Sequence, residues 1–392
     1  MWQTIRLGDV CTISSSKRIF AKEYQTEGIP FYRGKEVIEK HNGNKVSTEL
    51  FISPKRYEEI KGKYEVPKKG DILLTSVGTL GIPWLVDEDD FYFKDGNLTW
   101  LRCNTQILPS YLYLWLNSAE AQNQIDVKCI GSTQKALTIE TLNKFQITLP
   151  SLELQKKIVA VINPIESRIN INRSVNENLL DQMQALYKSW FVDFLPFDGV
   201  RPESWTKTDI YSLANIIYGA PFASKQFNTA GEGKPIIRIR DLKDQQFATY
   251  TTEVHPKGYL LQPGDIVVGM DGEFRPYIWG NDEAWLNQRV CVFENKRPNG
   301  KAFLYFTIKP LLFAIEQTQV ATTVIHIGKK DYDAFEITLP DTTTLDNFDA
   351  LTSPMIMQIV SNSFENKRLS SMRDALLPKL MSGEIDVSSI QL

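Results

Sequence analysis

The chain has 392 residues, of which 42% are hydrophobic and 23% are charged, and its formal net charge is −3. These values are ordinary for a globular protein of two or three domains, and no apolar run reaches the roughly 18 to 20 residues that a membrane span needs. The slightly acidic balance lacks the basic signature of many nucleic-acid-binding proteins but does not exclude that class. The first residues, MWQTIRLGDV, lack the features of a signal peptide, so we expect a cytoplasmic protein without a membrane partner.

Cysteine and histidine are too few and too scattered to predict a metal site. The four cysteines form no CxxC pair, and only three histidines accompany them. We therefore interpret the cysteines as free thiols in a reducing compartment and expect no metal.

The first 150 residues combine short strand-like segments with a single predicted helix. Gly and Pro punctuate the strands, and the segment 72–75 follows a Gly-Asp turn. The helix is expected at residues 109–123. The phrase FQITLP, at 145–150, closes this part of the chain.

A heptad pattern follows the hexapeptide, with Ser151 as the expected N-cap. Apolar or amide side chains recur at alternating steps of four and three, which is typical of a coiled-coil helix. The positions of this first seam are Ile158, Ile162, Ile165, Ile169, Asn172, Asn176 and Leu179, continued by Met183, Leu186 and Trp190. Pro164 lies inside the pattern and predicts a kink or restart.

The second half repeats the first in the same order. GIPFYRGKEV (28–37) aligns with GKPIIRIRDL (233–242), KKGDILLTSVGTLG (68–81) with QPGDIVVGMDGEFR (262–275), and NLTWLRCN (97–104) with QRVCVFEN (288–295). A helix interrupted by Pro310 is expected at 302–318. FEITLP, at 335–340, then repeats the hexapeptide. The chain is therefore a tandem duplication, with loop insertions accounting for the drift in spacing.

A second heptad pattern follows FEITLP, with residues 343–346 as a possible capping box. Its positions are Met355, Ile359, Asn362, Asn366 and Leu369, continued by Arg373, Leu376 and Leu380. Pro354 and Pro378 predict breaks in this helix. At an offset of 190 residues Asn172 corresponds to Asn362 and Asn176 to Asn366, and polar seam residues commonly set the register of a helix pair. The alternative is that these asparagines are solvated positions on frayed helices.

These patterns predict an α+β fold with two similar α/β modules and two long helices that pair antiparallel as a coiled coil. We expect module 1 at residues 1–150, a central spacer helix at 151–195, module 2 at 196–340 and a C-terminal spacer helix at 341–392. The seam from Ile158 to Trp190 would be about 50 Å long at roughly 1.5 Å per residue. That length would suit a ruler between the modules.

Catalytic motifs do not emerge from the sequence. It contains neither G-x-G-x-x-G nor a phosphate-binding G-x-x-x-x-G-K-[ST] loop, and the nearest approach to the latter, GEGKP at 231–235, has Pro235 in place of Ser or Thr. NPIE at 163–166 is not the Asn-Pro-Pro-aromatic loop of amino-methyltransferases. Candidate acidic-x-Lys pairs lack the upstream Pro-Asp of a nuclease, and the histidines have no convincing nucleophile nearby. We expect no catalytic residues.

The order of modules, helices and phrases resembles the specificity subunit of type I restriction-modification enzymes. GDILLTSVGTLG and GDIVVGMDGEF are similar to the strand and loop of that family's target recognition domains, and WLNQRVCVF (285–293), the ITLP phrases and LLPKLMSGEI (376–385) are similar to other family segments. The resemblance covers essentially the whole chain. It implies a non-catalytic subunit whose two domains each read one half of a split, asymmetric target in double-stranded DNA.

The same resemblance implies partners and cofactors. The paired helices would set the distance between the half-sites and dock methyltransferase subunits, of which two are expected. Those subunits would bind S-adenosylmethionine and methylate adenine, and restriction subunits would join and use ATP. No cofactor is expected in this chain itself.

Candidate DNA contacts are polar or charged residues in the predicted loops, because base edges are read by such side chains while Lys and Arg bind phosphates. In module 1 they are Arg33, Lys35, Thr75, Ser76, Thr79, Ser132, Thr133, Gln134 and Lys135. In module 2 they are Arg238, Arg240, Asp271, Glu273, Arg275, Asn287, Gln288, Arg289, Thr322 and Thr323. For each residue a purely structural role is the alternative, and Asp271, Glu273 and Arg289 in particular would suit internal salt bridges. Strand aromatics such as Trp84 and Trp285 are interpreted as core, and His326 as a buried or loop residue without a DNA contact.

Two competing functions stay open from sequence alone. A coiled-coil scaffold that assembles proteins without binding DNA fits the slight acidity, but the matched polar loops argue against it. A nuclease fused to a recognition half would need a metal site that the sequence does not provide.

Overall fold

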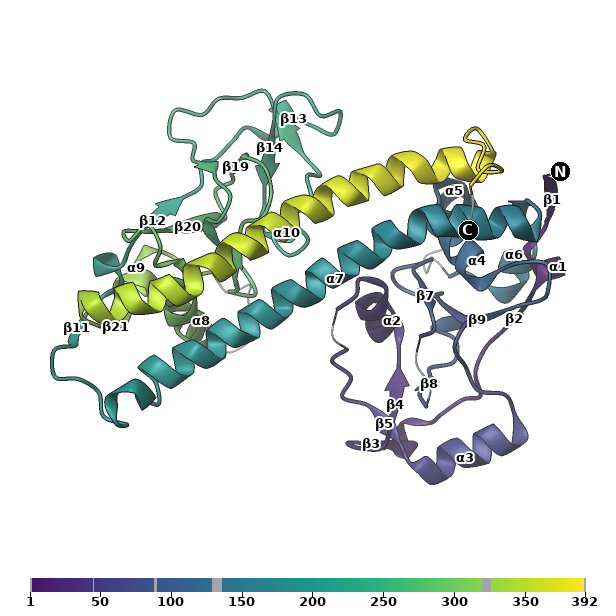
Figure 1. Ribbon diagram of the computed structural model, residues 1–392, viewed down its shortest axis with the longest axis horizontal. Helices are drawn as coiled ribbons and strands as arrows, with labels where there is room; N and C mark the ends of the chain where they lie inside the picture. Colours follow the sequence, from purple (N-terminus) through teal and green to yellow (C-terminus); the bar gives the residue numbers. More distant parts are fainter. Residues whose placement is uncertain (1, 45, 88–89, 129–135, 319–325, 391–392) are drawn as a thin grey trace. The chain divides into compact units, whose positions relative to one another are not determined.

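The computed structural model describes residues 2–44, 46–87, 90–128, 136–318 and 326–390. Two compact units divide the chain: unit 1 comprises Met1–Ile171 and Arg368–Leu392, and unit 2 comprises Asn172–Lys367. Each unit holds one module together with part of each long helix, α7 (Leu152–Phe191) and α10 (Thr342–Ser382) (Figure 1).

Module 1 is built from short strands and helices. The strands are β1 (Gln3–Arg6), β2 (Cys11–Ser14), β3 (Tyr24–Gln25), β4 (Ile29–Tyr32), β5 (Phe51–Ile52), β6 (Ile72–Thr75), β7 (Pro83–Leu85), β8 (Tyr92–Phe93), β9 (Leu98–Cys103) and β10 (Gln146–Leu149). The helices are α1 (Leu7–Val10), the 3-10 turn η1 (Ala21–Glu23), α2 (Gly34–His41), α3 (Pro54–Lys63), α4 (Pro109–Leu116), α5 (Ala119–Lys128) and α6 (Ile139–Asn143).

Module 2 contains the counterparts. The strands are β11 (Thr206–Asp209), β12 (Ala214–Tyr218), β13 (Phe227–Asn228), β14 (Lys234–Ile237), β15 (Tyr250–Thr251), β16 (Leu260–Leu261), β17 (Ile266–Gly269), β18 (Pro276–Ile278), β19 (Ala284–Leu286), β20 (Val290–Asn295) and β21 (Glu336–Leu339). The helical segments are η2 (Leu195–Phe197), η3 (Ile210–Ser212), η4 (Ser224–Gln226), η5 (Ile239–Asp241), α8 (Lys301–Thr318) and α9 (Lys329–Asp333).

The sheets of the two modules have the same topology. The order β2-β9-β6-β7 in module 1 matches β12-β20-β17-β18 in module 2, and β3-β5-β4-β8 matches β13-β15-β14-β19, to which module 2 adds β16. Even the single parallel pair of each second sheet recurs, as β4 with β8 and as β14 with β19. The predicted α+β fold with two similar modules is confirmed.

The repeated hexapeptides form the strand that closes each module. β10 pairs antiparallel with β1, and β21 pairs antiparallel with β11, so the end of each module is hydrogen-bonded to its beginning. The inner isoleucines, Ile147 and Ile337, are buried, whereas Gln146 and Glu336 are exposed, and Glu336 pairs with Lys207 at 2.8 Å. The alternation of buried and exposed side chains along a half-buried strand therefore explains the sequence of both hexapeptides.

The aspartate of the Gly-Asp turn accepts a hydrogen bond from the backbone three residues earlier in both modules, and a second one from an aromatic side chain. Asp71 Oδ2 accepts from the Lys68 backbone N–H at 3.0 Å and from Trp100 Nε1 at 2.9 Å. Asp265 Oδ2 accepts from the Gln262 backbone N–H at 2.8 Å and from the Tyr259 hydroxyl at 3.0 Å. Burial raises the pKa of both carboxyls despite these hydrogen bonds. The motif is a structural turn in both modules.

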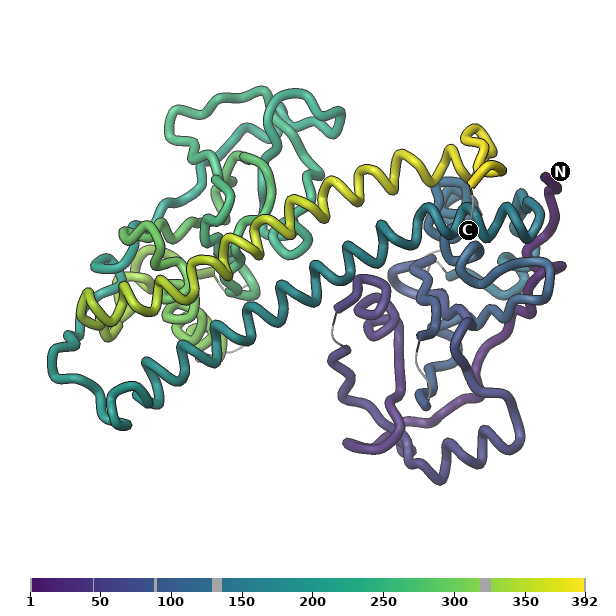
Figure 2. The backbone as a smooth tube through the Cα atoms, in the orientation of Figure 1, coloured from purple at the N-terminus to yellow at the C-terminus, as the bar shows by residue number. Residues whose placement is uncertain are grey.

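The long helices run antiparallel within each unit, as the colour order along the two helices shows (Figure 2). In unit 1 Arg373 Nη1 donates to Glu166 Oε1 at 3.0 Å. In unit 2 Asn172 Nδ2 donates to Asn366 Oδ1 at 2.9 Å, and Asn362 Nδ2 donates to Asn176 Oδ1 at 2.8 Å. The bonds therefore cross the repeat: Asn172 bonds Asn366, the counterpart of Asn176, and Asn176 bonds Asn362, the counterpart of Asn172. Every residue of the two predicted seams is buried or half-buried.

Several predicted helix boundaries are wrong. Both long helices continue through Pro164, Pro354 and Pro378 without a break. The helix expected at 109–123 is two helices, because the Ser118 hydroxyl accepts from the Ala121 backbone N–H and starts α5, whereas α8 runs on through Pro310. α10 is capped by Asp341, which accepts from the Thr344 backbone N–H at 3.0 Å, rather than by a box at 343–346. Ser151 caps α7 as expected, through Leu154 N–H at 3.4 Å.

Each module packs on a different part of the helix pair. In unit 1 Ile158 and Ile162 of α7 and Leu377 and Leu380 of α10 belong to one core with Trp115 of α4. In unit 2 Met183 of α7 and Ile356 and Ile359 of α10 share a core with Phe303 of α8. Among the described residues, no helix is long and apolar enough to cross a bilayer.

Candidate nucleic-acid interface

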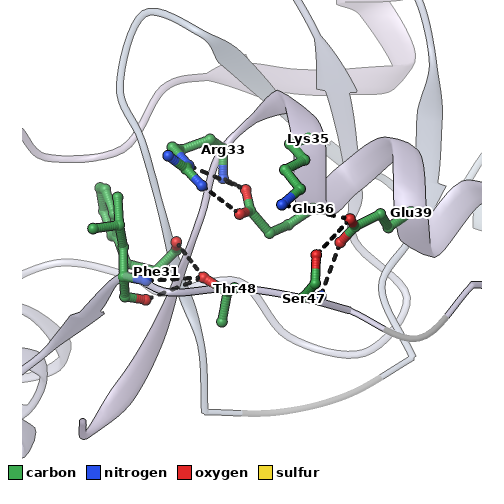
Figure 3. Close-up of polar contacts among 8 residues, drawn as sticks. Phe31, Arg33, Lys35, Glu36, Glu39, Ser47 and Thr48 are labelled. Atoms are coloured by element: carbon green, nitrogen blue, oxygen red, sulfur yellow. Dashed lines mark hydrogen bonds and ion pairs between the residues drawn. The ribbon is translucent and has the colours of Figure 1, made fainter. Parts of the chain in front are cut away.

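One arginine of module 1 is held by an acidic side chain three residues further on. Arg33 precedes α2, its Nη2 donates to Glu36 Oε1 at 2.8 Å, and its backbone N–H donates to Glu36 Oε2 at 2.8 Å (Figure 3). The Glu36 side chain is fully buried, and that of Arg33 is 35% exposed. Burial alone raises the pKa of Glu36, but the hydrogen bonds from Arg33 outweigh it and leave that pKa below its ordinary value. Arg33 is therefore an internal ion-pair partner that still presents charge at the surface.

Module 2 repeats this arrangement with Arg238 and Asp241. The Arg238 backbone N–H donates to Asp241 Oδ2 at 3.0 Å, and its Nε donates to the same oxygen at 3.2 Å. The Asp241 side chain is 6% exposed. Arg240 is more accessible, because its side chain is 70% exposed and its Nε lies 3.8 Å from Asp241 Oδ1. A pair common to both modules suits a role that both modules share, such as packing or a phosphate contact, rather than a base contact that differs between them.

Lys35 lies on the solvent side of α2. Its Nζ is 3.9 Å from Glu39 Oε1, and its side chain is 54% exposed (Figure 3). Glu39 also accepts from the Ser47 hydroxyl at 2.8 Å and the Ser47 backbone N–H at 3.0 Å. This long, exposed ion pair restrains the lysine weakly, so its Nζ can turn toward an anion.

The loop after β6 does not present all the residues predicted for it. Thr75 and Ser76 are buried. Thr75 Oγ1 accepts from the Ile82 backbone N–H at 2.9 Å, and the Ser76 and Thr99 hydroxyls lie 2.6 Å apart. Their hydroxyls are not available to a duplex, which contradicts the prediction for these two residues. Thr79 is exposed, beyond the turn that Gly78 makes with a φ of +80°.

The matching loop of module 2 turns at Gly272, also with a φ of +80°, and exposes Glu273. Arg275, by contrast, points back into the module. Its Nη1 donates to Glu316 Oε2 and its Nη2 to Glu316 Oε1 at 3.0 Å, and its guanidinium lies 5.8 Å from the Phe313 ring centre. These hydrogen bonds lower the pKa of Glu316. Arg275 is engaged in a bidentate internal pair, so the structure assigns it a structural contact.

Of the three residues predicted before β20, two are exposed. Gln288 is exposed and the Arg289 side chain is 53% exposed, while Asn287 is half-buried and its backbone pairs with Ala220. Arg289 Nη1 lies 3.6 Å from Asp271 Oδ1 and 3.1 Å from His326 Nδ1. His326 Nδ1 is also 2.7 Å from Asp271 Oδ1.

Sequence reasoning missed His326. From the sequence, this histidine is expected to be a buried or loop residue without a DNA contact. In the structure its side chain is 46% exposed and contacts Asp271 and Arg289, two of the predicted DNA-binding residues. A signal existed, because His326 corresponds to Ala136 at the 190-residue offset and so follows the loop predicted to bind DNA. Six predicted contacts in those loops lie outside the described residues: Ser132, Thr133, Gln134, Lys135, Thr322 and Thr323.

The part of the chain that the structure describes holds no group of three or more His, Cys, Asp or Glu side chains able to bind a metal ion. Apart from Glu273, the exposed candidates among the described residues are cations, an amide and a hydroxyl: Lys35 and Thr79 in module 1, and Arg240, Gln288 and Arg289 in module 2. Such side chains can donate to phosphates and base edges.

Two α/β modules of matching sheet order, apart from the extra strand β16 of module 2, each pack on part of an antiparallel helix pair and define a duplicated two-domain class of fold. The sequence profile of the type I restriction modification DNA specificity domain matches residues 1–180 and 202–356. The chain therefore belongs to the type I restriction-modification specificity family, whose members are non-catalytic recognition subunits.

Relatives support this assignment along the whole chain. The chain is 24% identical to the MjaIX specificity subunit of Methanocaldococcus jannaschii over 426 residues, covering 99% of this chain and 94% of the relative. It is 24% identical to the HindI specificity subunit of Haemophilus influenzae over 400 residues, covering 81% and 87%. It is 37% identical to the EcoBI specificity subunit of Escherichia coli over 139 residues, covering 35% and 29%.

A solved structure shares the fold. The crystal structure of the type I restriction-modification S subunit of M. genitalium superposes with a TM-score of 0.54 at 13% identity, covering 97% of this chain and 96% of that one.

Proposed function

We propose that this chain reads a split, asymmetric target in double-stranded DNA, with each module addressing one half-site. The observation that carries this proposal is one scaffold built twice with different loop side chains. A shared scaffold places both sets of loops in the same way, while different side chains such as Thr79 and Glu273 select different bases.

The helices α7 and α10 supply the spacing and the docking in this proposal. A seam of about 50 Å corresponds to roughly 15 base pairs at about 3.4 Å each, so bases between the half-sites would go unread. Two methyltransferase subunits would dock on the chain, bind S-adenosylmethionine and methylate adenine within the target. Restriction subunits that use ATP would join through them.

Methylome sequencing of cells with and without this chain tests the proposal directly. The expected result is one bipartite motif with two different halves and a methylated adenine, present only when the chain is present. A continuous or palindromic motif would contradict the split reading, and an unchanged methylome would contradict the function as a whole.

A scaffold that never touches DNA is the competing function, favoured by the net charge of −3. The two functions differ in the salt dependence of DNA binding, because only a DNA-reading subunit forms phosphate contacts that salt weakens.

A further inference from the structure

The sheet register changes which residues of the two modules correspond. In module 1 Thr75 of β6 pairs with Leu98 of β9, and in module 2 Gly269 of β17 pairs with Val290 of β20. Leu98 therefore corresponds to Val290, not to Arg289 as the aligned segments NLTWLRCN and QRVCVFEN suggest. The sequence alignment is wrong here by one residue, and Arg289 corresponds to Asn97.

A backbone frame of three positions recurs beside this register. In module 1 the Ser76 N–H donates to Asn97 O at 2.8 Å and the Leu137 N–H donates to Ser76 O at 2.9 Å. In module 2 the Met270 N–H donates to Arg289 O at 2.9 Å and the Ile327 N–H donates to Met270 O at 2.9 Å.

An isolated antiparallel bridge completes the frame in each module. It joins Val77 to Ala136 in module 1 and Asp271 to His326 in module 2. We call these positions the three-residue frame: Val77, Asn97 and Ala136 in module 1, and Asp271, Arg289 and His326 in module 2.

The same frame carries different chemistry in the two modules. In module 2 its side chains form a charged cluster in which Arg289 contacts both Asp271 and His326. In module 1 Val77 is an apolar side chain that is 45% exposed, Ala136 is exposed, and Asn97 is half-buried. Two modules that recognise different DNA sequences need the same backbone hydrogen bonds with different side chains, and the frame has both. Arg33 and Arg238 are the same residue in both modules, so they carry no such difference.

Each set of side chains matches particular base edges in the major groove. An arginine binds the N7 and O6 acceptors of guanine, an asparagine binds adenine N7 and N6, and an apolar side chain contacts the thymine methyl group. We propose, on the basis of the DNA-reading function above, that the three-residue frame determines specificity. Arg289 reads a guanine in the half-site of module 2, and Asn97 with Val77 reads an A·T pair in the half-site of module 1.

Asp271 is a positioning residue in this proposal. Its Oδ1 lies 3.6 Å from Arg289 Nη1 and 2.7 Å from His326 Nδ1, so it restrains both side chains. Its loss should leave the preferred base unchanged and weaken the preference, whereas the loss of Arg289 should remove the preference.

The test is a methylome comparison in cells that carry the full chain with its own partner subunits, followed by binding competition between duplexes that differ at one base pair. The variants are Arg289→Gln, Asp271→Asn, and the triple exchange Asp271→Val, Arg289→Asn, His326→Ala, which places the side chains of module 1 on module 2. Lys225→Ala is the matched control, since it removes one exposed positive charge from the same module at a residue outside the frame.

In the expected result Arg289→Gln lowers discrimination at one G·C pair of one half-site by roughly 10- to 100-fold and leaves the other half-site unchanged. Asp271→Asn keeps the guanine preference at reduced strength, and the triple exchange shifts the same position toward A·T. An unchanged motif would overturn the proposal, and so would loss of all methylation in Arg289→Gln when Lys225→Ala retains it. If the wild-type chain directs no motif, the failure lies with the proposed function.

Discussion

At the scale of single residues, the same acid–arginine pair has been retained in both modules for a physical reason. A carboxylate as buried as Glu36 is costly unless hydrogen bonds and an opposite charge compensate for the lost solvation. Arg33 supplies both, through its backbone N–H and its guanidinium. Asp241 obtains the same compensation from Arg238. The sequence predicted both arginines as DNA contacts. It could not show that they pair with carboxylates, because those carboxylates are recognised as partners only once their burial in the fold is known.

Replacing Glu36 by Gln should destabilise unit 1. The variant loses the charge that Arg33 compensates and leaves hydrogen bonds imperfectly satisfied, so we expect the free energy of unfolding to fall by about 1–3 kcal/mol. Urea denaturation followed by tryptophan fluorescence measures the change. Glu58→Gln, at a side chain that is 69% exposed, is the control and should change stability by less than about 0.5 kcal/mol.

The contribution of Glu36 should depend on pH in a defined direction. Its pKa in the folded state lies below the ordinary 4.5, so the ionised form stabilises the fold above that value. The stability is lost as pH falls through the lowered folded-state pKa. The difference in unfolding free energy between the wild type and Glu36→Gln should therefore be largest at pH 7 and should shrink as the pH falls below about 4.5. A difference that widens in acid would contradict the ion pair.

At the scale of elements, the long helices combine an apolar seam with paired asparagines. Asn172 is 2% exposed and donates to Glu365 at 2.8 Å as well as to Asn366. Buried amides are tolerated where partners exist and are costly in any other register, so these pairs favour a single alignment of α7 and α10. The prolines were expected to kink or break the helices, but both helices continue across them.

Replacing Asn172 by Ala should cost about 1–3 kcal/mol of unfolding free energy, because it removes a buried amide and leaves Asn366 without its donor in a partly buried site. Replacing both Asn172 and Asn366 by Leu should recover much of that loss, since apolar pairs suit a seam. Thermal unfolding by circular dichroism measures both variants. Asn170→Ala, at an exposed position of the same helix, is the control. Equal losses in the single and double variants would argue against the hydrogen-bonded pair.

At the scale of the whole molecule, the placement of charge explains how a slightly acidic chain can belong to a DNA-binding family. The net charge of −3 is a property of all 392 residues, whereas binding depends on the cations that reach phosphates. Exposed cations occur in both modules, for example Lys35 and Arg240. Local placement of charge therefore matters more than the sum.

DNA binding by the chain with its partner subunits should weaken steeply with salt. If six to ten phosphates are contacted, affinity should fall by about 10³- to 10⁵-fold between 50 and 200 mM salt. Fluorescence anisotropy of a labelled duplex measures this slope. Arg240→Ala should lower the slope and weaken binding to all sequences about equally, while Glu273→Gln should not lower it. A salt-independent affinity would support the scaffold function instead.

Much of the architecture follows from the sequence by itself. The repeat, the heptad seams and the two hexapeptides are periodic or local signals, and local hydrophobic patterns dictate local structure wherever one face is buried. They predicted the two modules, the two helices and the family resemblance. The candidate site was harder to predict from the sequence. Thr75, Ser76 and Arg275 are polar residues near loops, and the partners that occupy their side chains cannot be identified from the sequence pattern.

Only the tertiary structure decided which polar side chains remain available. The one-residue shift between Asn97 and Arg289 is set by strand pairing, and the cluster of Asp271, Arg289 and His326 is assembled from three separate segments. Sequence periodicity carries no information about such contacts, because they depend on which strands lie side by side. The sequence determined that this chain is built as two similar modules and two long helices, and the fold decided which side chains each module presents.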